Sequence, residues 1–212
     1  MTTQSEWSPK RAAWANAMQI EARRALDALP WLDLEAWIGL SHGRGFMPRR
    51  IKVVTRSKYW HVKIRIGIGD PRDLVFEASW GLPWKMGGVR FSYAETHKPA
   101  GTDWYPLLST TPALCVDLAG HCTSVLGAGY DWISCLRFVP WIRHVIGERE
   151  GRRQRLVYNC SKFGVKMIRA IGLEPIPRKL AFQVSPGDFV YSALLADPVT
   201  LDATGPILVG SL

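Results

Sequence analysis

Two short segments, residues 61–66 and 74–78, constrain the fold more than any other feature of the chain. In 61–66 (HVKIRI) polar and apolar residues alternate strictly, as expected for a strand with one buried face. Residues 67–73 contain the Gly and Asp residues typical of a turn, and 74–78 (LVFEA) form a second, mainly apolar run. The pattern predicts a β-hairpin, and therefore an antiparallel sheet.

Helices are predicted on both sides of this hairpin in the sequence. Ser8 followed by Pro9 is typical of a helix N-cap and first turn, and small and apolar residues recur among charged ones up to about Leu29. Residues 112–145 are rich in small and apolar side chains and indicate further helix, interrupted at 127–129 (GAG). Together with the hairpin, these segments predict an α+β fold.

The last third of the chain has the clearest helix boundaries. Residues 160–171 carry apolar side chains four apart, with Asn159 in a capping position and Gly172 just beyond the end. Residues 185–188 (SPGD) then predict a turn that enters a final strand over 189–194. Residues 85–106, rich in Gly, Pro and aromatic side chains without a clean period, predict a long ordered excursion that shapes a cleft.

The charge balance and the cysteine spacing narrow the classes of partner and cofactor. The 27 basic and 18 acidic side chains of the 212 residues give a formal charge of +9, which favours anionic surroundings such as nucleic acid, envelope phosphates or an acidic protein. Cys115, Cys122, Cys135 and Cys160 form no C-x-x-C pair and no zinc-finger spacing. We therefore expect mostly free thiols and no metal centre.

No export or anchoring segment is evident in the sequence. Residues 1–6 are polar and lack the basic-then-apolar pattern of a signal peptide, and the longest uncharged stretch is short and Gly-rich. We expect a chain that is cytoplasmic or is delivered in a virion or by a secretion system.

Cys160 is the strongest candidate for a reactive residue. It is predicted to lie in the first turn of a helix, where the helix dipole and free backbone amides stabilise a thiolate. A buried structural thiol is the alternative. His61 opens one strand of the hairpin and Glu77 lies on the other, so the histidine could act as a base that the carboxylate orients.

Five sequence blocks resemble a known family. They are 50–62 (RIKVVTRSKYWHV), 75–78 (VFEA), 130–132 (YDW), 158–163 (YNCSKF) and 185–188 (SPGD). In this order they resemble the permuted branch of the NlpC/P60 papain-like superfamily, which includes YiiX-like amidases and, more distantly, lecithin retinol acyltransferase relatives. In the unpermuted family the cysteine block precedes the histidine block, whereas here the histidine comes first.

The resemblance implies a role for each matched residue. Cys160 would be the nucleophile, His61 the base, Glu77 the orienting residue, and Tyr158 a contributor to the oxyanion hole beside the Cys160 amide. It also implies a circularly permuted papain-like α+β fold, with an antiparallel sheet packed on the nucleophile helix and an extra N-terminal helix. The chain then divides into an N-terminal helical extension, 1–44, and a catalytic domain, 45–212.

The activity that the resemblance implies is cysteine-dependent hydrolysis of an amide or ester bond through an acyl-enzyme, without cofactor or metal. Relatives cleave peptidoglycan stem peptides, other amides or lipid acyl bonds, and the family implies a bacteriophage-encoded virion component or an injected effector. The alternative is a non-catalytic assembly module that binds nucleic acid or an acidic protein through its basic residues, which include Arg49, Arg50, Lys52, Arg152, Arg153 and Arg155.

Overall fold

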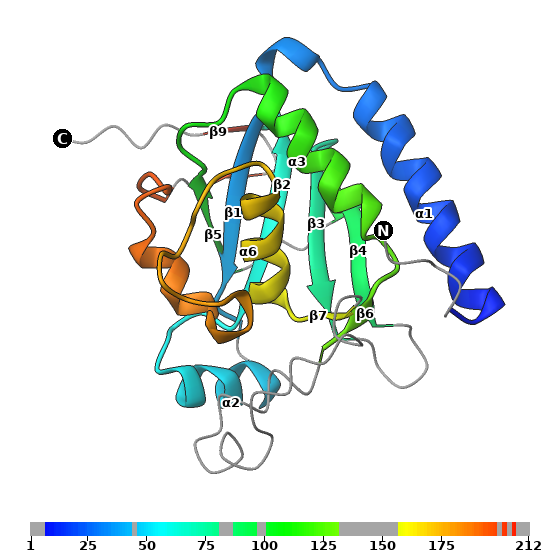
Figure 1. Ribbon diagram of the computed structural model, residues 1–212. Coiled ribbons are helices and arrows are strands. Elements are labelled where there is room, and N and C mark those ends of the chain that lie inside the picture. Colours follow the sequence, from blue (N-terminus) through cyan, green and yellow to red (C-terminus); the bar gives the residue numbers. More distant parts are fainter. Residues whose placement is uncertain are drawn as a thin grey trace.

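One antiparallel sheet organises the computed structural model, which describes residues 7–43, 46–80, 87–96, 101–131, 157–198, 201–202 and 205–206. Its strands follow the order β4-β3-β2-β1-β5. They are β1 (Glu35–Ser41), β2 (His61–Gly67), β3 (Leu74–Ser79), β4 (Gly88–Tyr93) and β5 (Thr102–Pro106). The protein is therefore of mixed α+β architecture, as predicted (Figure 1).

Four α-helices accompany this sheet in the described residues: α1 (Pro9–Asp27), α2 (Phe46–Thr55), α3 (Pro112–Ser124) and α6 (Cys160–Ala170). Short elements complete the chain: η2 (Trp31–Asp33), η3 (Ala94–Thr96), β6 (Gly129–Tyr130), β7 (Val157–Tyr158), η5 (Ala181–Gln183), η6 (Pro186–Tyr191), β8 (Leu201–Asp202) and β9 (Gly205–Pro206). Within the described part of the chain, no helix combines the length and apolar character that crossing a membrane requires.

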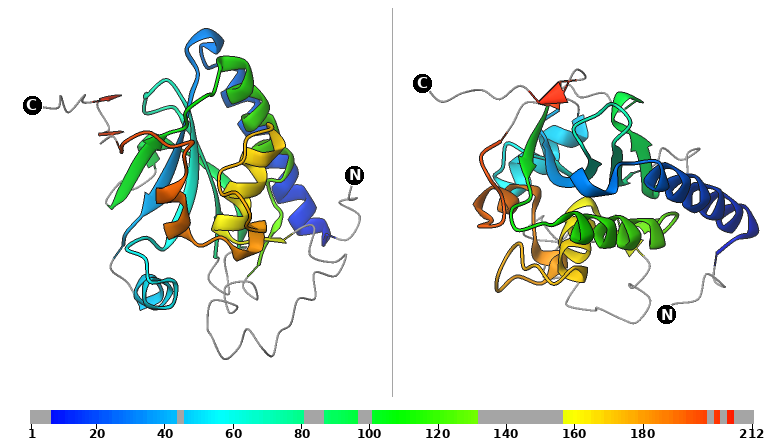
Figure 2. Two further views of the ribbon diagram at one scale, coloured as in Figure 1. Left: turned by 60° about the vertical axis from the view of Figure 1, so that its left-hand side comes forward. Right: turned by 90° about the horizontal axis from the view of Figure 1, so that it is seen from above.

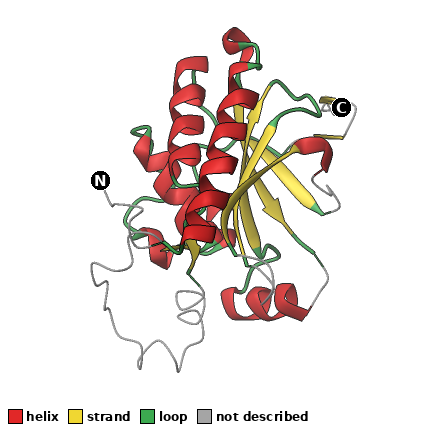
Figure 3. Ribbon diagram, turned by 90° about the vertical axis from the view of Figure 1, so that its right-hand side faces the viewer, coloured by secondary structure: helices red, strands yellow, loops and turns green. Residues whose placement is uncertain are grey.

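The helices α1, α3 and α6 cover one face of the sheet (Figures 1, 2 and 3). The apolar residues of the alternating strand, Val62, Ile64 and Ile66, are fully buried in the core beneath them. The predicted hairpin is confirmed, because β2 and β3 pair antiparallel with Lys63 opposite Glu77. Alternation of apolar and polar residues thus selects which side of β2 the helices cover.

Asp73 fixes the turn between β2 and β3. Its carboxylate accepts hydrogen bonds from the backbone of Ile68 and Gly69, both at 2.9 Å, and from Nε of Arg65 at 2.8 Å. A side chain at Gly67 would collide with it, because a Cβ there would lie 1.9 Å from the Asp73 carboxylate. The turn is therefore specified by its side chains as well as by its backbone.

The predicted N-terminal extension, 1–44, is helical only in part. Ser8 caps α1 as expected, with Pro9 in the first turn. However, residues Glu35–Ser41 form β1, a strand that pairs with both β2 and β5. The prediction that this part of the chain is helical was therefore wrong for residues Glu35–Ser41. A domain boundary at residue 44 would also separate an interior strand from the rest of the sheet.

The predicted excursion over 85–106 also differs from the structure. Its described residues supply the two edge strands, β4 and β5, joined in part by the short η3. Edge strands pair on one side only, so their sequences need not alternate as strictly as a strand such as β2. This explains why the sequence pattern of residues Gly88–Tyr93 and Thr102–Pro106 was not recognised as that of strands.

The final strand predicted over 189–194 is not formed. Residues Pro186–Tyr191 instead make the 3₁₀ helix η6. Asp188 stabilises its start, accepting hydrogen bonds from the backbone N–H of Ser185 at 2.8 Å and from its hydroxyl at 3.1 Å. This capping box closes the turn into a helix. Of the helix predicted over 112–145, α3 is confirmed up to Ser124, and 132–145 lie outside the described residues.

A close approach of α6 to β2 is possible because residue 164 is a glycine. A Cβ at Gly164 would lie 3.1 Å from both the Phe189 ring and a methyl group of Val62. The predicted helix at 160–171 is confirmed as α6, which ends at Ala170, and all but a few of its side chains are buried. The absence of a side chain at residue 164 therefore sets the distance between this helix and the strand that begins at His61.

We predict that Gly164→Leu lowers the free energy of unfolding by about 1–3 kcal/mol, because the added side chain overpacks the contact between α6 and β2. Gly120→Leu is the matched control, since Gly120 lies in α3 and its added Cβ would meet no atom within 4 Å. In the control, helix propensity favours Leu by up to about 1 kcal/mol. Urea unfolding measures both; equal effects would contradict the packing argument.

Candidate active site

Cys160 is the first residue of α6. Asn159 caps the helix, and its side-chain oxygen accepts a 2.7 Å hydrogen bond from the backbone N–H of Lys162. Cys160 is 7% exposed, so the residue is largely enclosed by the protein. Its position at a helix N-terminus, which the sequence predicted, favours the thiolate.

His61 and Glu77 lie beside Cys160, on the two strands of the hairpin. Nε2 of His61 and Oε2 of Glu77 are 2.8 Å apart. The His61 ring also hydrogen bonds with the Cys160 thiol. Because Nε2 faces Glu77, Nδ1 is the nitrogen left for the sulfur. The three residues therefore form a hydrogen-bonded series in the order Cys160, His61, Glu77.

The electrostatics of Cys160 and His61 favour an ion pair. Burial would raise the pKa of Cys160, but the charge of His61 and hydrogen bonds from His61, the Val62 backbone and Ser161 hold this pKa below its ordinary value. Burial would lower the pKa of His61, but the charge of Cys160 and hydrogen bonds with Cys160 and Glu77 raise it to about 9. Both shifts favour the pair of a thiolate and an imidazolium over the pair of neutral groups.

Glu77 is held as a carboxylate by cations on its own face of the sheet. Burial would raise its pKa, yet the hydrogen bond to His61 and the charges of His61, Arg90 and Lys63 keep this pKa well below its usual range. Nε and Nη2 of Arg90 both donate to Oε1, the oxygen that His61 does not use. Sequence reasoning missed Arg90, because β4 was not recognised as a strand.

Tyr158, predicted to contribute to an oxyanion hole, lies on β7 and is buried. Its ring meets that of Phe163 edge-on at 6.3 Å, and the Lys166 ammonium lies 5.5 Å from its centre. Burial raises the pKa of its hydroxyl. These contacts place the ring against α6, and none of them is with Cys160, His61 or Glu77. Its predicted role stays a prediction.

A buried ion pair supports the start of α6. Lys162 Nζ lies 3.3 Å from Oδ2 of Asp131, and both side chains are less than 5% exposed. The backbone N–H of Asp131 donates to the carbonyl of Tyr158, next to the parallel pair β6 and β7. The described residues of one matched block, 130–131, thus meet another matched block, 158–163, beside the cysteine.

A second network lies near the same end of the sheet. Ser41 pairs with His61 in the sheet register, and the next residue, His42, places Nε2 3.1 Å from Oδ1 of Asp103. The Tyr59 hydroxyl donates to the other Asp103 oxygen at 2.6 Å. Trp60, between Tyr59 and His61, stacks on the His61 ring with centroids 5.1 Å apart. His42 and Asp103 lie far apart in the sequence, so no local pattern predicted their contact.

The other described cysteines differ from Cys160. Cys115 and Cys122 are free and buried, and burial raises the pKa of both thiols. Cys135 lies outside the described residues. In the described ranges, no group of three or more His, Cys, Asp or Glu side chains could hold a metal ion.

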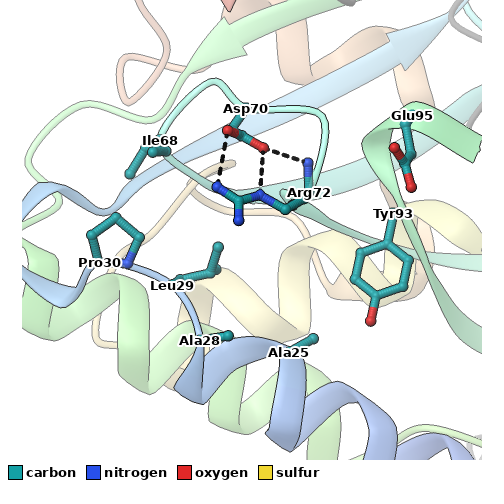
Figure 4. Close-up of a pocket in the computed structure, with 9 residues that line it drawn as sticks. All are labelled: Ala25, Ala28, Leu29, Pro30, Ile68, Asp70, Arg72, Tyr93 and Glu95. Carbon is teal, nitrogen blue, oxygen red and sulfur yellow. Dashed lines mark hydrogen bonds and ion pairs between the residues drawn. The ribbon is translucent and has the colours of Figure 1, made fainter.

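A pocket of about 250 Å³ lies at the opposite end of the sheet from His61, around the turn between β2 and β3 (Figure 4). An ion pair between Asp70 and Arg72 forms part of its wall. The complete lining is Ala25, Ala28, Leu29, Pro30, Ile68, Asp70, Arg72, Tyr93 and Glu95. This pocket includes none of the residues that the sequence predicted for the site.

Comparison of the chain with protein-family models and with curated proteins gave no match.

We predict that iodoacetamide modifies Cys160 at pH 5–6, about 3 units below the ordinary thiol pKa, where unactivated thiols are protonated. Cys115 and Cys122 should stay unmodified, since burial raises the pKa of both thiols. Peptide mapping by mass spectrometry identifies the modified residue. An acidic-pH reaction rate for Cys160 no faster than that of free cysteine would contradict the ion pair.

Proposed function

We propose that this protein is a cysteine hydrolase with a circularly permuted papain-like fold, acting on an amide or ester bond through an acyl-enzyme. The observation that carries the proposal is the hydrogen-bonded series Cys160, His61 and Glu77, with the thiol at the N-terminus of α6. Nucleophile, base and orienting group in this arrangement are what covalent catalysis by a thiol requires.

Contacts between the matched sequence blocks support the proposed fold. A Cβ at Gly187 in the SPGD turn would lie 2.4 Å from the Ser57 hydroxyl, so this turn touches the segment just before His61. Blocks far apart in the sequence therefore converge around one site, which is expected if the permuted order reflects one ancestral arrangement.

The proposed reaction has two stages. The Cys160 thiolate attacks the carbonyl carbon, and the backbone amide of Cys160 stabilises the developing oxyanion. His61 then gives its Nδ1 proton to the leaving amine or alcohol as the bond to carbon breaks, and a thioester remains. In the second stage His61 takes a proton from water, the hydroxide attacks the thioester, and the acid and the thiolate are released.

Glu77 keeps the imidazole in the required orientation during both stages. Its hydrogen bond to Nε2 leaves Nδ1 facing the sulfur, and its charge stabilises the imidazolium. The carboxylate does not need to take up a proton, because its pKa is held well below its usual range.

A peptide or amide bond of the peptidoglycan type is the substrate we propose, with lipid acyl esters as the competing class. The charge of +9 suits a chain that works on an anionic envelope. The alternative is the non-catalytic assembly module. It would be favoured if the protein bound nucleic acid with an affinity that falls steeply as salt rises and that does not change when Cys160 is replaced.

We predict that Cys160→Ala and Cys160→Ser preserve the fold but lower kcat/KM by about 10³-fold or more, because the nucleophile is lost. His61→Ala should lose activity by about 10²–10⁴-fold. The double variant should lose little more than Cys160→Ala alone, since the two residues act as one unit. Glu77→Gln should lose less activity than His61→Ala, because Glu77 orients the imidazole and does not itself react.

Hydrolysis of defined peptidoglycan fragments and simple acyl esters measures these losses, with circular dichroism to confirm folding. Cys115→Ala is the matched control, because Cys115 is a buried thiol on α3 and should be replaceable without loss of turnover. Intact-protein mass spectrometry should also detect one acyl group on the wild type and none on Cys160→Ala. Equal turnover by wild type and Cys160→Ala would exclude the mechanism.

A further inference from the structure

Three charged residues lie opposite one another across the sheet, on the strands β4, β3 and β2. Arg90 pairs with Glu77, and Glu77 pairs with Lys63. The central carboxylate divides its two oxygens between partners. Oε2 faces Nε2 of His61 at 2.8 Å, while Oε1 receives both Nε, at 2.8 Å, and Nη2 of Arg90.

We propose that Arg90 is a positioning residue, which holds the Glu77 carboxylate so that Oε2 stays directed at His61. The inference rests on the proposed function, since it assigns how the base of that reaction is oriented. Two donors of one planar guanidinium hold Oε1 in place more specifically than a single point charge does, and with Oε1 held there Oε2 stays available to His61.

The position of the Glu77 carboxylate needs to be held because Lys63 is a second cation that can attract it. Its ammonium is buried, and its one described hydrogen bond is a 3.3 Å contact with the Thr102 hydroxyl. Burial lowers the pKa of Lys63, whereas the charge of Glu77 raises it. A buried cation with donors to spare beside Glu77 competes with His61 for the carboxylate. Arg90 prevents Glu77 from turning toward Lys63.

The groups that bear on the titration of His61 come from α6 and from the strands β2, β3 and β4, while His42, just after the neighbouring β1, and Asp103, on β5, pair with each other. Cys160 on α6 and Glu77 on β3 contact the ring. Lys63 and Arg90 act through Glu77. Farther along α6, Lys162 is paired with Asp131. The coupled pair of Cys160 and His61 titrates in two steps: loss of the thiol proton, and loss of the imidazolium proton at higher pH.

The charge of Arg90 and its geometry predict different shifts in these two steps. Loss of a positive charge alone raises both pKa values, because it favours the protonated state at each step. Loss of the Glu77–His61 hydrogen bond instead destabilises the imidazolium, which lowers the upper pKa, and weakens its support of the thiolate, which raises the lower one. Only the loss of positioning narrows the pH window in which the ion pair exists.

The test is the pH dependence of Cys160 modification by iodoacetate. This anionic reagent reacts best with a thiolate beside an imidazolium, so its rate rises with the first step and falls with the second. The variants are Arg90→Lys, which keeps the charge without the fork, and Arg90→Gln, which keeps neither. Arg72→Gln is the matched control, because Arg72 also pairs with a carboxylate but at the other end of the sheet.

We expect Arg90→Lys to narrow the window, because the lower pKa rises and the upper pKa falls, each by about half a pH unit or more. In Arg90→Gln the lost charge raises both pKa values in addition, so its lower pKa should rise further than that of Arg90→Lys while the lost charge opposes the fall of its upper pKa. Arg72→Gln should leave both limbs unchanged. Combining Lys63→Met with Arg90→Gln should widen the window again, because the competing cation is removed. Circular dichroism and urea unfolding identify any variant whose fold is altered.

Several outcomes would overturn the inference. If Arg90→Lys leaves the pH window unchanged and Arg90→Gln raises both pKa values of the rate profile, Arg90 acts through its charge alone. Windows like that of the wild type in both variants would mean that Arg90 has no role in the site. If wild-type Cys160 itself shows no reactivity at acidic pH, the proposed function fails first. A normal wild-type window with unaffected variants rejects only the role of Arg90.

Discussion

The contact between α6 and β2 at Gly164 is the constraint on which the candidate site depends. Gly164 lies against Val62, the residue that follows His61, so the distance between helix and strand is set one turn from Cys160. A larger side chain would force the helix away from the sheet. The thiol and the imidazole would then separate, because each is fixed to the end of a rigid element rather than to a loop.

Burial of charge is the second feature of this site. His61 and Glu77 are each 5% exposed, and an isolated charge at that depth would be strongly destabilising. Each is stabilised by a partner of opposite sign: His61 by Cys160 and Glu77, and Glu77 in turn by Arg90. Because removing one partner leaves the next charge uncompensated, the series behaves as a unit. The same couplings lower the pKa values of the thiol and of the carboxylate.

The two ends of the sheet are built differently. At one end, β2 begins with His61 and meets the N-terminus of α6, and charged groups from three strands and a helix converge. At the other end, Asp73 closes the turn and the described pocket has an exposed ion pair in its wall. The buried side chains Cys160, His61 and Glu77, whose pKa values are shifted, therefore all lie at the first end.

The sequence by itself determined the local elements whose signals are local. Alternation in 61–66 specified a strand, which the structure buries on both faces, and the cap at Asn159 placed Cys160 at the start of a helix. It also named His61 and Glu77, and the predicted hairpin led to the expectation that the carboxylate orients the imidazole, the two groups that lie 2.8 Å apart in the structure. Only the tertiary structure decided that β1 lies inside the sheet and that Arg90 reaches Glu77. These outcomes depend on cross-strand pairing and long-range hydrogen bonds, and such contacts leave no periodic trace in a single sequence.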